Sequence, residues 1–354
     1  MAQAQEDIDS IVITARKQIY ENPDKAIQLA QTVYDYPNVS VNNKINSLLI
    51  ISTAYSSKRD YKKSSEYVER IKELFPEVDN NKTRMNILNR IGGHYQELQI
   101  YDKAIEYLDE SLILIENYPE QDSIQSFLGY NATLRGFIYR EQMNCDIAIK
   151  YFNKAIEAYE SIVEAHIKKA NLSICLYNKG NCLLSLGKIE EAKTSFLTAI
   201  AYGKDVDALS LIAFGKKGLA EAKTLEGNYN EAITLLKKAN TISENVGDLI
   251  LNKVIYEALA NNYLALNDWE NYNYYHNKYR SLQKETKNAE RKSVNQSIIK
   301  LTETKAKEIE QLKNKYKPIQ IGLLIFIAIA LFVLIRLIFS GEKRLKKLQR
   351  KLKT

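Results

Sequence analysis

Residues 227–239 read GNYNEAITLLKKA and contain the pattern that predicts the fold. Gly227 suits a tight turn, Tyr229 and Ala232 follow it, and Leu236 and Ala239 come four and seven residues after Ala232. Residues spaced by three and four lie on one face of an α-helix. The stretch therefore predicts a turn into a helix in which the small residue Ala232 lets a neighbouring helix approach closely.

The same pattern recurs along the first 280 residues of the chain. The positions equivalent to Ala232 are spaced by 38 to 44 residues, and they are Ala26, Ser64, Ala104, Ala148, Ala192 and, less perfectly, Tyr272. Twelve residues before each of the later positions lies another small residue, namely Ser52, Gly92, Gly136, Gly180, Ala220 and Ala260. Low Gly and Pro content, 13 and 5 residues, also favours helices. Recurring offsets of this kind predict an array of antiparallel helix pairs.

The segment from Gly227 to Ala232 resembles the turn into the second helix of a tetratricopeptide repeat, and Pro76 matches the helix-ending proline of that family. The resemblance covers roughly residues 8–280. It implies an all-α fold, a superhelical array of about seven antiparallel helix pairs that fills residues 1–280. The period of 38–44 residues exceeds the roughly 34 residues usual for the family, so other helical-pair repeats stay open as an alternative.

In tetratricopeptide proteins the first helix of each pair lines a concave groove. Carried over position by position, the resemblance implies that this groove is lined by Asn89, Gln96, Tyr130, Phe137, Arg140, Tyr177, Asn181, Lys217, Glu221, Glu257 and Asn261. Amides, rings and charges of both signs suit an extended peptide or a helix. We therefore expect a protein or peptide ligand, and merely solvated side chains are the alternative at each position.

A second part of the sequence predicts contact with a membrane. Residues 319–339 read IQIGLLIFIAIALFVLIRLIF, in which only Gln320 and Arg336 are strongly polar. As a helix this stretch is roughly 31 Å long, which matches a hydrocarbon core of about 30 Å. We expect one transmembrane helix over residues 318–340, with Pro318 in its first turn, where a missing N–H costs nothing. A buried core helix is the alternative.

The formal net charge of +7 lies in residues 336–354, which contain eight basic residues, beginning with Arg336, and one acid, Glu342. The basic tail, residues 341–354, is predicted to be cytoplasmic, and the side chains expected at the membrane interface are Arg336, Lys343, Arg344, Lys346 and Lys347. Because the rest of the chain is close to neutral, no nucleic acid is expected as a partner. Residues 281–317 are rich in Lys and Glu and predict a charged helical stalk, through which a homodimeric coiled coil stays open as an alternative.

Topology depends on how the chain reaches the membrane. Residues 1–5, MAQAQ, have neither the basic nor the apolar region of a signal peptide, and we expect that a cleaved signal precedes them. The repeats would then be periplasmic at a bacterial inner membrane, and the tail cytoplasmic. In the alternative, the repeats are cytosolic and the chain is a tail-anchored adaptor that assembles a membrane protein complex.

The order of repeats, stalk, single span and basic tail resembles the sensory half of single-span regulators of Bacteroidota. This resemblance implies a membrane-anchored scaffold or receptor that binds a protein or peptide and relays or organises a signal. The sequence contains no recognisable kinase or DNA-binding module after the span, so a separate output partner is expected.

Little in the sequence indicates catalysis. The three histidines, His94, His166 and His276, lack metal-ligand spacing, and no phosphate loop or nucleophile motif is present. Cys175 and Cys182 would lie roughly 10 Å apart on one helix, too far for a disulfide, and all three cysteines are interpreted as packing residues. We expect no enzyme activity, no metal and no cofactor.

Overall fold

The computed structural model of the chain describes residues 2–244, 246 and 248–351, and in these residues the only regular structure is helical. The elements are α1 (Ala2–Gln18), α2 (Pro23–Tyr34), α3 (Val41–Ser57), α4 (Tyr61–Leu74), η1 (Phe75–Glu77), α5 (Asn81–Glu97), α6 (Tyr101–Glu116), η2 (Gln121–Ile124), α7 (Gln125–Glu141), α8 (Cys145–Glu160), α9 (Ala165–Ser185), α10 (Ile189–Asp205), α11 (Leu209–Leu225), α12 (Tyr229–Ser243), α13 (Leu249–Ala265) and α14 (Trp269–Lys351). The α-helices follow one another as antiparallel pairs, which confirms the predicted all-α repeat array.

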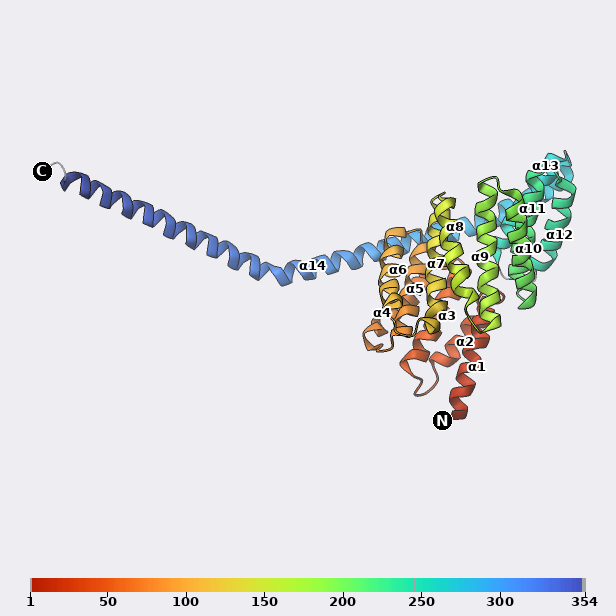
Figure 1. Ribbon diagram of the computed structural model, residues 1–354, viewed down its shortest axis with the longest axis horizontal. Helices are drawn as coiled ribbons and strands as arrows, with labels where there is room; N and C mark the ends of the chain where they lie inside the picture. The colour runs from red at the N-terminus through yellow and green to blue at the C-terminus, as the bar shows by residue number, and fades with distance from the viewer. Residues whose placement is uncertain (1, 245, 247, 352–354) are drawn as a thin grey trace. The chain divides into compact units, whose positions relative to one another are not determined.

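Successive helix pairs lie side by side in chain order (Figure 1). Each pair packs internally, as α5 does on α6, and the first helices of neighbouring pairs also contact one another, from α1 and α3 through to α11 and α13. The first helix of each pair therefore buries apolar side chains against the second helix of the same pair and against the next pair. This is the arrangement of a solenoid.

The small residues named from the sequence lie where the helices cross. In the second helices, Ala26, Ala104, Ala148, Ala192 and Ala232 are fully buried. In the first helices, a Cβ built on Gly136 would lie 2.5 Å from the Phe152 ring, and one built on Gly180 would lie 2.5 Å from the Phe196 ring. Only glycine allows these rings to pack so closely at these two positions.

The turn between the two helices of a pair has one repeated backbone feature. The residue seven after each small residue of the first helix has a positive φ, and these residues are Arg59, Gln99, Met143, Gly187, Gly227 and Asn267, with φ between 57° and 78°. A left-handed residue just past a helix end is a common way to terminate the helix. The turn therefore keeps its left-handed residue even in the pairs that have no glycine at this position.

The array curls back on itself. The Glu21 carboxylate, in the turn between α1 and α2, accepts hydrogen bonds from the backbone N–H and the Oγ–H of Ser210 at the start of α11. A contact between the first and sixth pairs requires that the array be curved. One face of the array is therefore concave.

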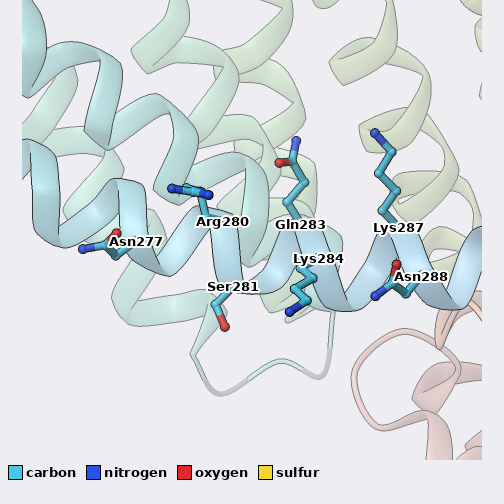
Figure 2. A pocket seen from close by; sticks show the side chains of 7 residues that line it. All are labelled: Asn277, Arg280, Ser281, Gln283, Lys284, Lys287 and Asn288. Carbon is cyan, nitrogen blue, oxygen red and sulfur yellow. The ribbon is translucent and has the colours of Figure 1, made fainter.

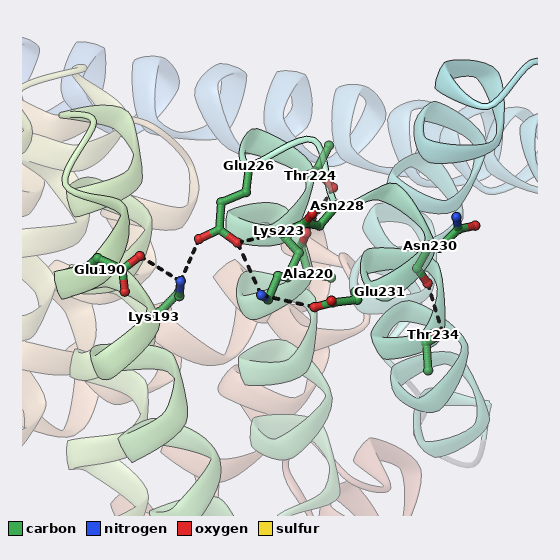
Figure 3. A network of polar contacts seen from close by, with 10 residues as sticks. All are labelled: Glu190, Lys193, Ala220, Lys223, Thr224, Glu226, Asn228, Asn230, Glu231 and Thr234. Atoms are coloured by element: carbon green, nitrogen blue, oxygen red, sulfur yellow. Dashed lines mark hydrogen bonds and ion pairs between the residues drawn. The ribbon is translucent and has the colours of Figure 1, made fainter.

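Surface charges add contacts between neighbouring pairs (Figure 3). Lys193 of α10 lies 2.8 Å from Glu190 and 2.6 Å from Glu226, and Lys223 lies 3.3 Å from Glu226 and 3.1 Å from Glu231. The hydrogen bond from Lys193 is the largest influence that lowers the pKa of the Glu226 carboxyl, and Lys223 adds to it. This network joins α10, α11 and α12.

The chain divides into two compact units, Met1–Asn295 and Gln296–Thr354. Packing in the first unit continues past residue 280, since Thr286 on α14 is only 1% exposed. The expectation that Pro318 starts the membrane helix is wrong, because α14 is helical on both sides of it and Pro318 lies in its interior. Proline there leaves one backbone carbonyl of the preceding turn without its helical donor.

One helical segment of the second unit is long and apolar enough to cross a membrane, within the range Lys305–Lys346. Its apolar side chains are exposed; Phe326 and Phe332, for example, are 70% and 65% exposed. Arg336, Lys343, Arg344 and Lys346 are exposed, while the side chain of Lys347 and residues 352–354 of the predicted tail lie outside what the structure describes.

Candidate peptide-binding surface

Two aromatic rings from neighbouring pairs meet on α9 and α11. The Tyr177 ring lies 5.3 Å from the Phe214 ring and 6.0 Å from the buried Phe196 ring, tilted by 49° in both cases. Tyr177 and Phe214 remain partly exposed. The two rings therefore form a partly exposed aromatic surface that packs on the buried Phe196 ring.

Lys217 lies one turn after Phe214 on α11. Its Nζ pairs with Glu221 at 2.5 Å, and its side chain is 13% exposed. Desolvation lowers the pKa of Lys217, but Tyr177 and Glu221 outweigh it, so the pKa lies above its ordinary value. The ammonium group therefore stays charged at neutral pH beside the two rings.

Asn181 follows Tyr177 by one helical turn on α9. Its Oδ1 atom is buried and has no hydrogen-bond partner in the part of the chain that the structure describes. A buried acceptor without a donor costs roughly 1–3 kcal/mol. We refer to Tyr177, Asn181, Phe214, Lys217 and Glu221 as the Tyr177–Lys217 surface; it combines rings, a charge pair and a buried acceptor without a described donor.

The last predicted groove positions lie on α13. Glu257 lies near the Tyr279 hydroxyl of α14, and desolvation followed by the charge of Glu257 raises the pKa of Tyr279. Glu257 therefore already interacts with α14 of the same chain. Asn261 is exposed.

Three other predicted positions hold the array together instead of facing a ligand. Asn89 is fully buried, where its amide donates to the Phe127 carbonyl at 3.0 Å and its Oδ1 accepts from Asn131 at 2.9 Å. Gln96 donates to Glu141 at 3.0 Å, and Arg140 donates to Asn178. For Asn89, Gln96 and Arg140 the expectation of a free groove side chain is therefore corrected, because their polar groups bond to the next pair.

Gln96 and Arg140 belong to a repeated contact. Both lie four residues after the small residue of their helix, as do Ser56 and Thr224. Ser56 donates to Glu97 in the next pair, and Thr224 donates to Asn262 at 2.9 Å. Residues at this offset therefore form hydrogen bonds between the first helices of consecutive pairs.

The two remaining positions lie on α7 and contact arginines. The guanidinium of Arg90 lies 4.6 Å above the Tyr130 ring and donates to its hydroxyl at 3.3 Å. Phe137 packs 5.9 Å from Phe152, with Arg140 5.5 Å above its ring. The Tyr130 and Phe137 rings and the Arg90 guanidinium therefore extend the candidate surface onto α5 and α7.

Sequence reasoning missed Phe214 and Arg90. Phe214 lies six residues before Ala220, as Tyr130 lies six residues before Gly136, so this offset would have found it. Arg90 lies two residues before Gly92, an offset that the pattern did not include. Its role becomes visible only through its contact with Tyr130 from the next pair.

A polar hollow of about 480 Å³ runs along α14 and is lined by Asn277, Arg280, Ser281, Gln283, Lys284, Lys287 and Asn288 (Figure 2). Figure 2 shows Arg280, Gln283 and Lys287 pointing to one side of the helix and Ser281 to the other. All seven residues belong to one helix, so they do not enclose a ligand. Among the described residues, no group of three or more His, Cys, Asp and Glu side chains could hold a metal ion.

Comparison with known proteins supports the fold. A tetratricopeptide repeat family model matches residues 175–202, which lie in α9 and α10. The crystal structure of Rap protein complexed with Competence and Sporulation Factor matches at a TM-score of 0.58 and 15% identity, covering 80% of this chain and 78% of that chain. NprR in complex with its cognate peptide NprX matches at a TM-score of 0.55 and 18% identity, covering 78% of each chain.

A signal-transduction ATPase with a tetratricopeptide repeat sensor, from Pyrococcus horikoshii, matches at a TM-score of 0.50 and 16% identity over 74% of this chain and 40% of that chain. No curated protein matches the sequence significantly. The family match to one helix pair and the fold shared with these structures support a tetratricopeptide-like repeat array.

Proposed function

We propose that this tetratricopeptide repeat protein binds an extended peptide, or an extended segment of a protein, on the Tyr177–Lys217 surface. The observation that carries the proposal is the unpaired Oδ1 of Asn181 one turn from the Tyr177 ring. Once the Asn181 side chain rotates toward the surface, a peptide N–H can satisfy the amide oxygen while the rings pack against a side chain. Rap and NprR, which share the fold, are seen in complex with a signalling factor and a peptide, and this supports the proposal.

Charge adds selectivity to this surface. Lys217 is charged and mostly buried, and it forms an ion pair with Glu221, whose side chain is 37% exposed. A ligand carboxylate can replace Glu221 at the ammonium group, and charge-assisted hydrogen bonds are about twice as strong as neutral ones. We expect peptides with an acidic residue or a free C-terminus to bind in preference to basic ones.

Binding is tested with the full chain in detergent and a crosslinking pull-down that compares the native surface with Tyr177→Ala and Asn181→Ala. Both substitutions are expected to remove the same captured partners. Asn153→Ala, an exposed amide on α8, is the matched control and is expected to leave capture unchanged. Unchanged partners in the two surface variants would exclude this surface as the binding site.

We further propose that the helix within Lys305–Lys346 anchors the array to a bacterial inner membrane, with residues 281–317 as its stalk and residues 318–340 as the span. In this role the protein relays or organises a signal through a separate output partner. The exposed bases Arg336, near the end of the apolar segment, and Lys343 and Arg344, after it, favour a cytoplasmic tail.

Protease protection in spheroplasts tests the topology. With periplasmic repeats, protease digests the array once the outer membrane is opened. Digestion only after lysis of the inner membrane would instead place the repeats in the cytosol and overturn the proposed orientation. Site-specific crosslinking within residues 281–317 tests whether the stalk also forms a homodimer.

A further inference from the structure

Two cysteines that are far apart in the sequence meet at the junction between the fourth and fifth helix pairs. Cys145 is the first residue of α8 and Cys182 lies near the end of α9. Cys182 is fully buried in a cluster with Ala148 and Phe152, and the half-buried Cys145 packs against the same cluster. The two cysteines therefore pack against the same apolar residues, and the nearby Cys145 thiol contributes to the raised pKa of the Cys182 thiol. Both are free thiols in this structure.

The third cysteine lies elsewhere. Cys175, also on α9, is buried in a separate cluster with Tyr159 and Leu172, and its sulfur lies 3.3 Å from the Thr133 hydroxyl. Burial raises the pKa of the Cys175 thiol to about 12. It is therefore an inert packing residue, and it provides a matched control for the other two.

The two paired thiols differ in access to solvent. Cys145 is half-buried at the end of a helix, whereas Cys182 is enclosed. Burial, followed by the hydrogen bond with Cys145, raises the pKa of the Cys182 thiol. Since the thiolate is the nucleophile in disulfide exchange and needs access to its partner, Cys145 is the residue that an external oxidant reaches first.

We propose that Cys145 and Cys182 form a disulfide bond when the array meets a disulfide-bearing oxidant, and that this bond locks the fourth pair to the fifth. The Cys145 thiolate attacks one sulfur of the oxidant and releases the other as a thiol, which forms a mixed disulfide. The Cys182 thiolate then attacks the Cys145 sulfur and releases the second thiol. The two cysteines lose two protons and two electrons, and the oxidant becomes two thiols.

The bond would add a covalent link to a junction that already carries the Arg140–Asn178 hydrogen bond. It closes a loop of about 37 residues, and cross-linking such a loop restricts the unfolded chain. A rise of about 5–10 °C in Tm is the expected result, because the oxidised chain has fewer unfolded conformations to gain. This modification goes beyond the proposed binding function and does not depend on it.

The test uses the folded full chain in detergent, incubated with oxidised glutathione and then denatured and labelled with a thiol-reactive polyethylene glycol. The native protein is expected to lose two of its three labels, and peptide mapping to identify a Cys145–Cys182 linkage. Cys175→Ala is expected to retain that linkage. Cys145→Ser is expected to keep all remaining thiols reduced and to show no rise in Tm.

Several outcomes would overturn the proposal. They are three unreacted thiols in the folded protein, a glutathione adduct on Cys145 that Cys182 never displaces, or a linkage that involves Cys175. Circular dichroism of each variant checks that it is folded, so that a lost linkage is not the result of unfolding. A Cys182→Ala variant that accumulates glutathione on Cys145 would independently identify Cys145 as the attacking thiol.

Discussion

The carboxylate of Glu21 accepts two hydrogen bonds from Ser210, one from the backbone N–H at 3.2 Å and one from Oγ–H at 2.6 Å. Ser210 lies in the first turn of α11, where Ala208 at the N-cap provides no side-chain bond. Backbone N–H groups in the first turn of a helix have no partner within the helix. Glu21 from the first pair therefore caps a helix of the sixth pair and closes the curve of the array.

Glu21→Ala is expected to lower the stability of this contact by about 1–2 kcal/mol, the usual cost of losing a helix cap. Amide hydrogen exchange at Ser210 and its neighbours should become faster, and the radius of gyration from small-angle scattering should increase. Asp24→Ala removes an exposed ion pair with Lys58 nearby and should change neither quantity. Equal effects of the two substitutions would argue against closure by Glu21.

Met143→Gly is expected to stabilise the protein by about 0.5–1 kcal/mol. Met143 has a φ of 60° and is 89% exposed, so the substitution relieves backbone strain and removes few contacts. Gly187 occupies the equivalent turn with a φ of 74°, and a Cβ there would touch nothing. Gly187→Ala should therefore destabilise by about 1 kcal/mol through the backbone alone. Urea denaturation midpoints that move in opposite directions confirm the prediction.

Gly136→Ala tests the close helix crossing. Alanine normally stabilises a helix by up to about 1 kcal/mol relative to glycine. Here its Cβ would lie 2.5 Å from the fully buried Phe152 ring, and overpacking of this kind costs about 1–3 kcal/mol, so the net effect should be a loss of stability. The double variant with Phe152→Leu should recover part of the loss, and a double variant less stable than either single one would contradict the explanation.

His94 makes stability depend on pH. Its ring is buried between the hydroxyls of Ser64 and Ser65, at 3.2 and 3.0 Å, and burial followed by the charge of Lys72 lowers its pKa from 6.5 to about 3. The unfolded chain therefore binds more protons than the folded chain between pH 6.5 and 3. Stability should fall as the pH drops through this window, by up to ~1.4 kcal/mol per pH unit.

The measurement is the urea midpoint as a function of pH. His94→Gln, which keeps hydrogen-bonding capacity without a titrating group in this range, should flatten the profile below pH 6.5. His166→Gln changes an exposed histidine and should leave the profile unchanged. An unaltered slope in His94→Gln would show that other groups cause the dependence.

The repeat itself could be predicted from the sequence because it depends on local spacing. The small residue Ala148 is followed four residues later by the bulky Phe152, and helix geometry places residues at this offset on one face. The apolar composition of residues 319–339 likewise predicts a span without any tertiary information. Both features depend on the spacing or the composition of residues within a single helix.

Tertiary structure decided which polar side chains are free. Asn89 lies three residues before the small residue of its first helix and Asn181 one residue after the small residue of another, one turn apart in the repeat. Asn89 is hydrogen-bonded to Phe127 and Asn131, whereas the Asn181 oxygen has no described partner. The difference arises from the neighbouring pair. The residues that this pair places against each asparagine cannot be predicted from the sequence of one helix alone. The meetings of Glu21 with Ser210 and of Cys145 with Cys182 have the same origin, because the curvature and the packing of successive pairs bring together residues that local periodicity leaves unrelated.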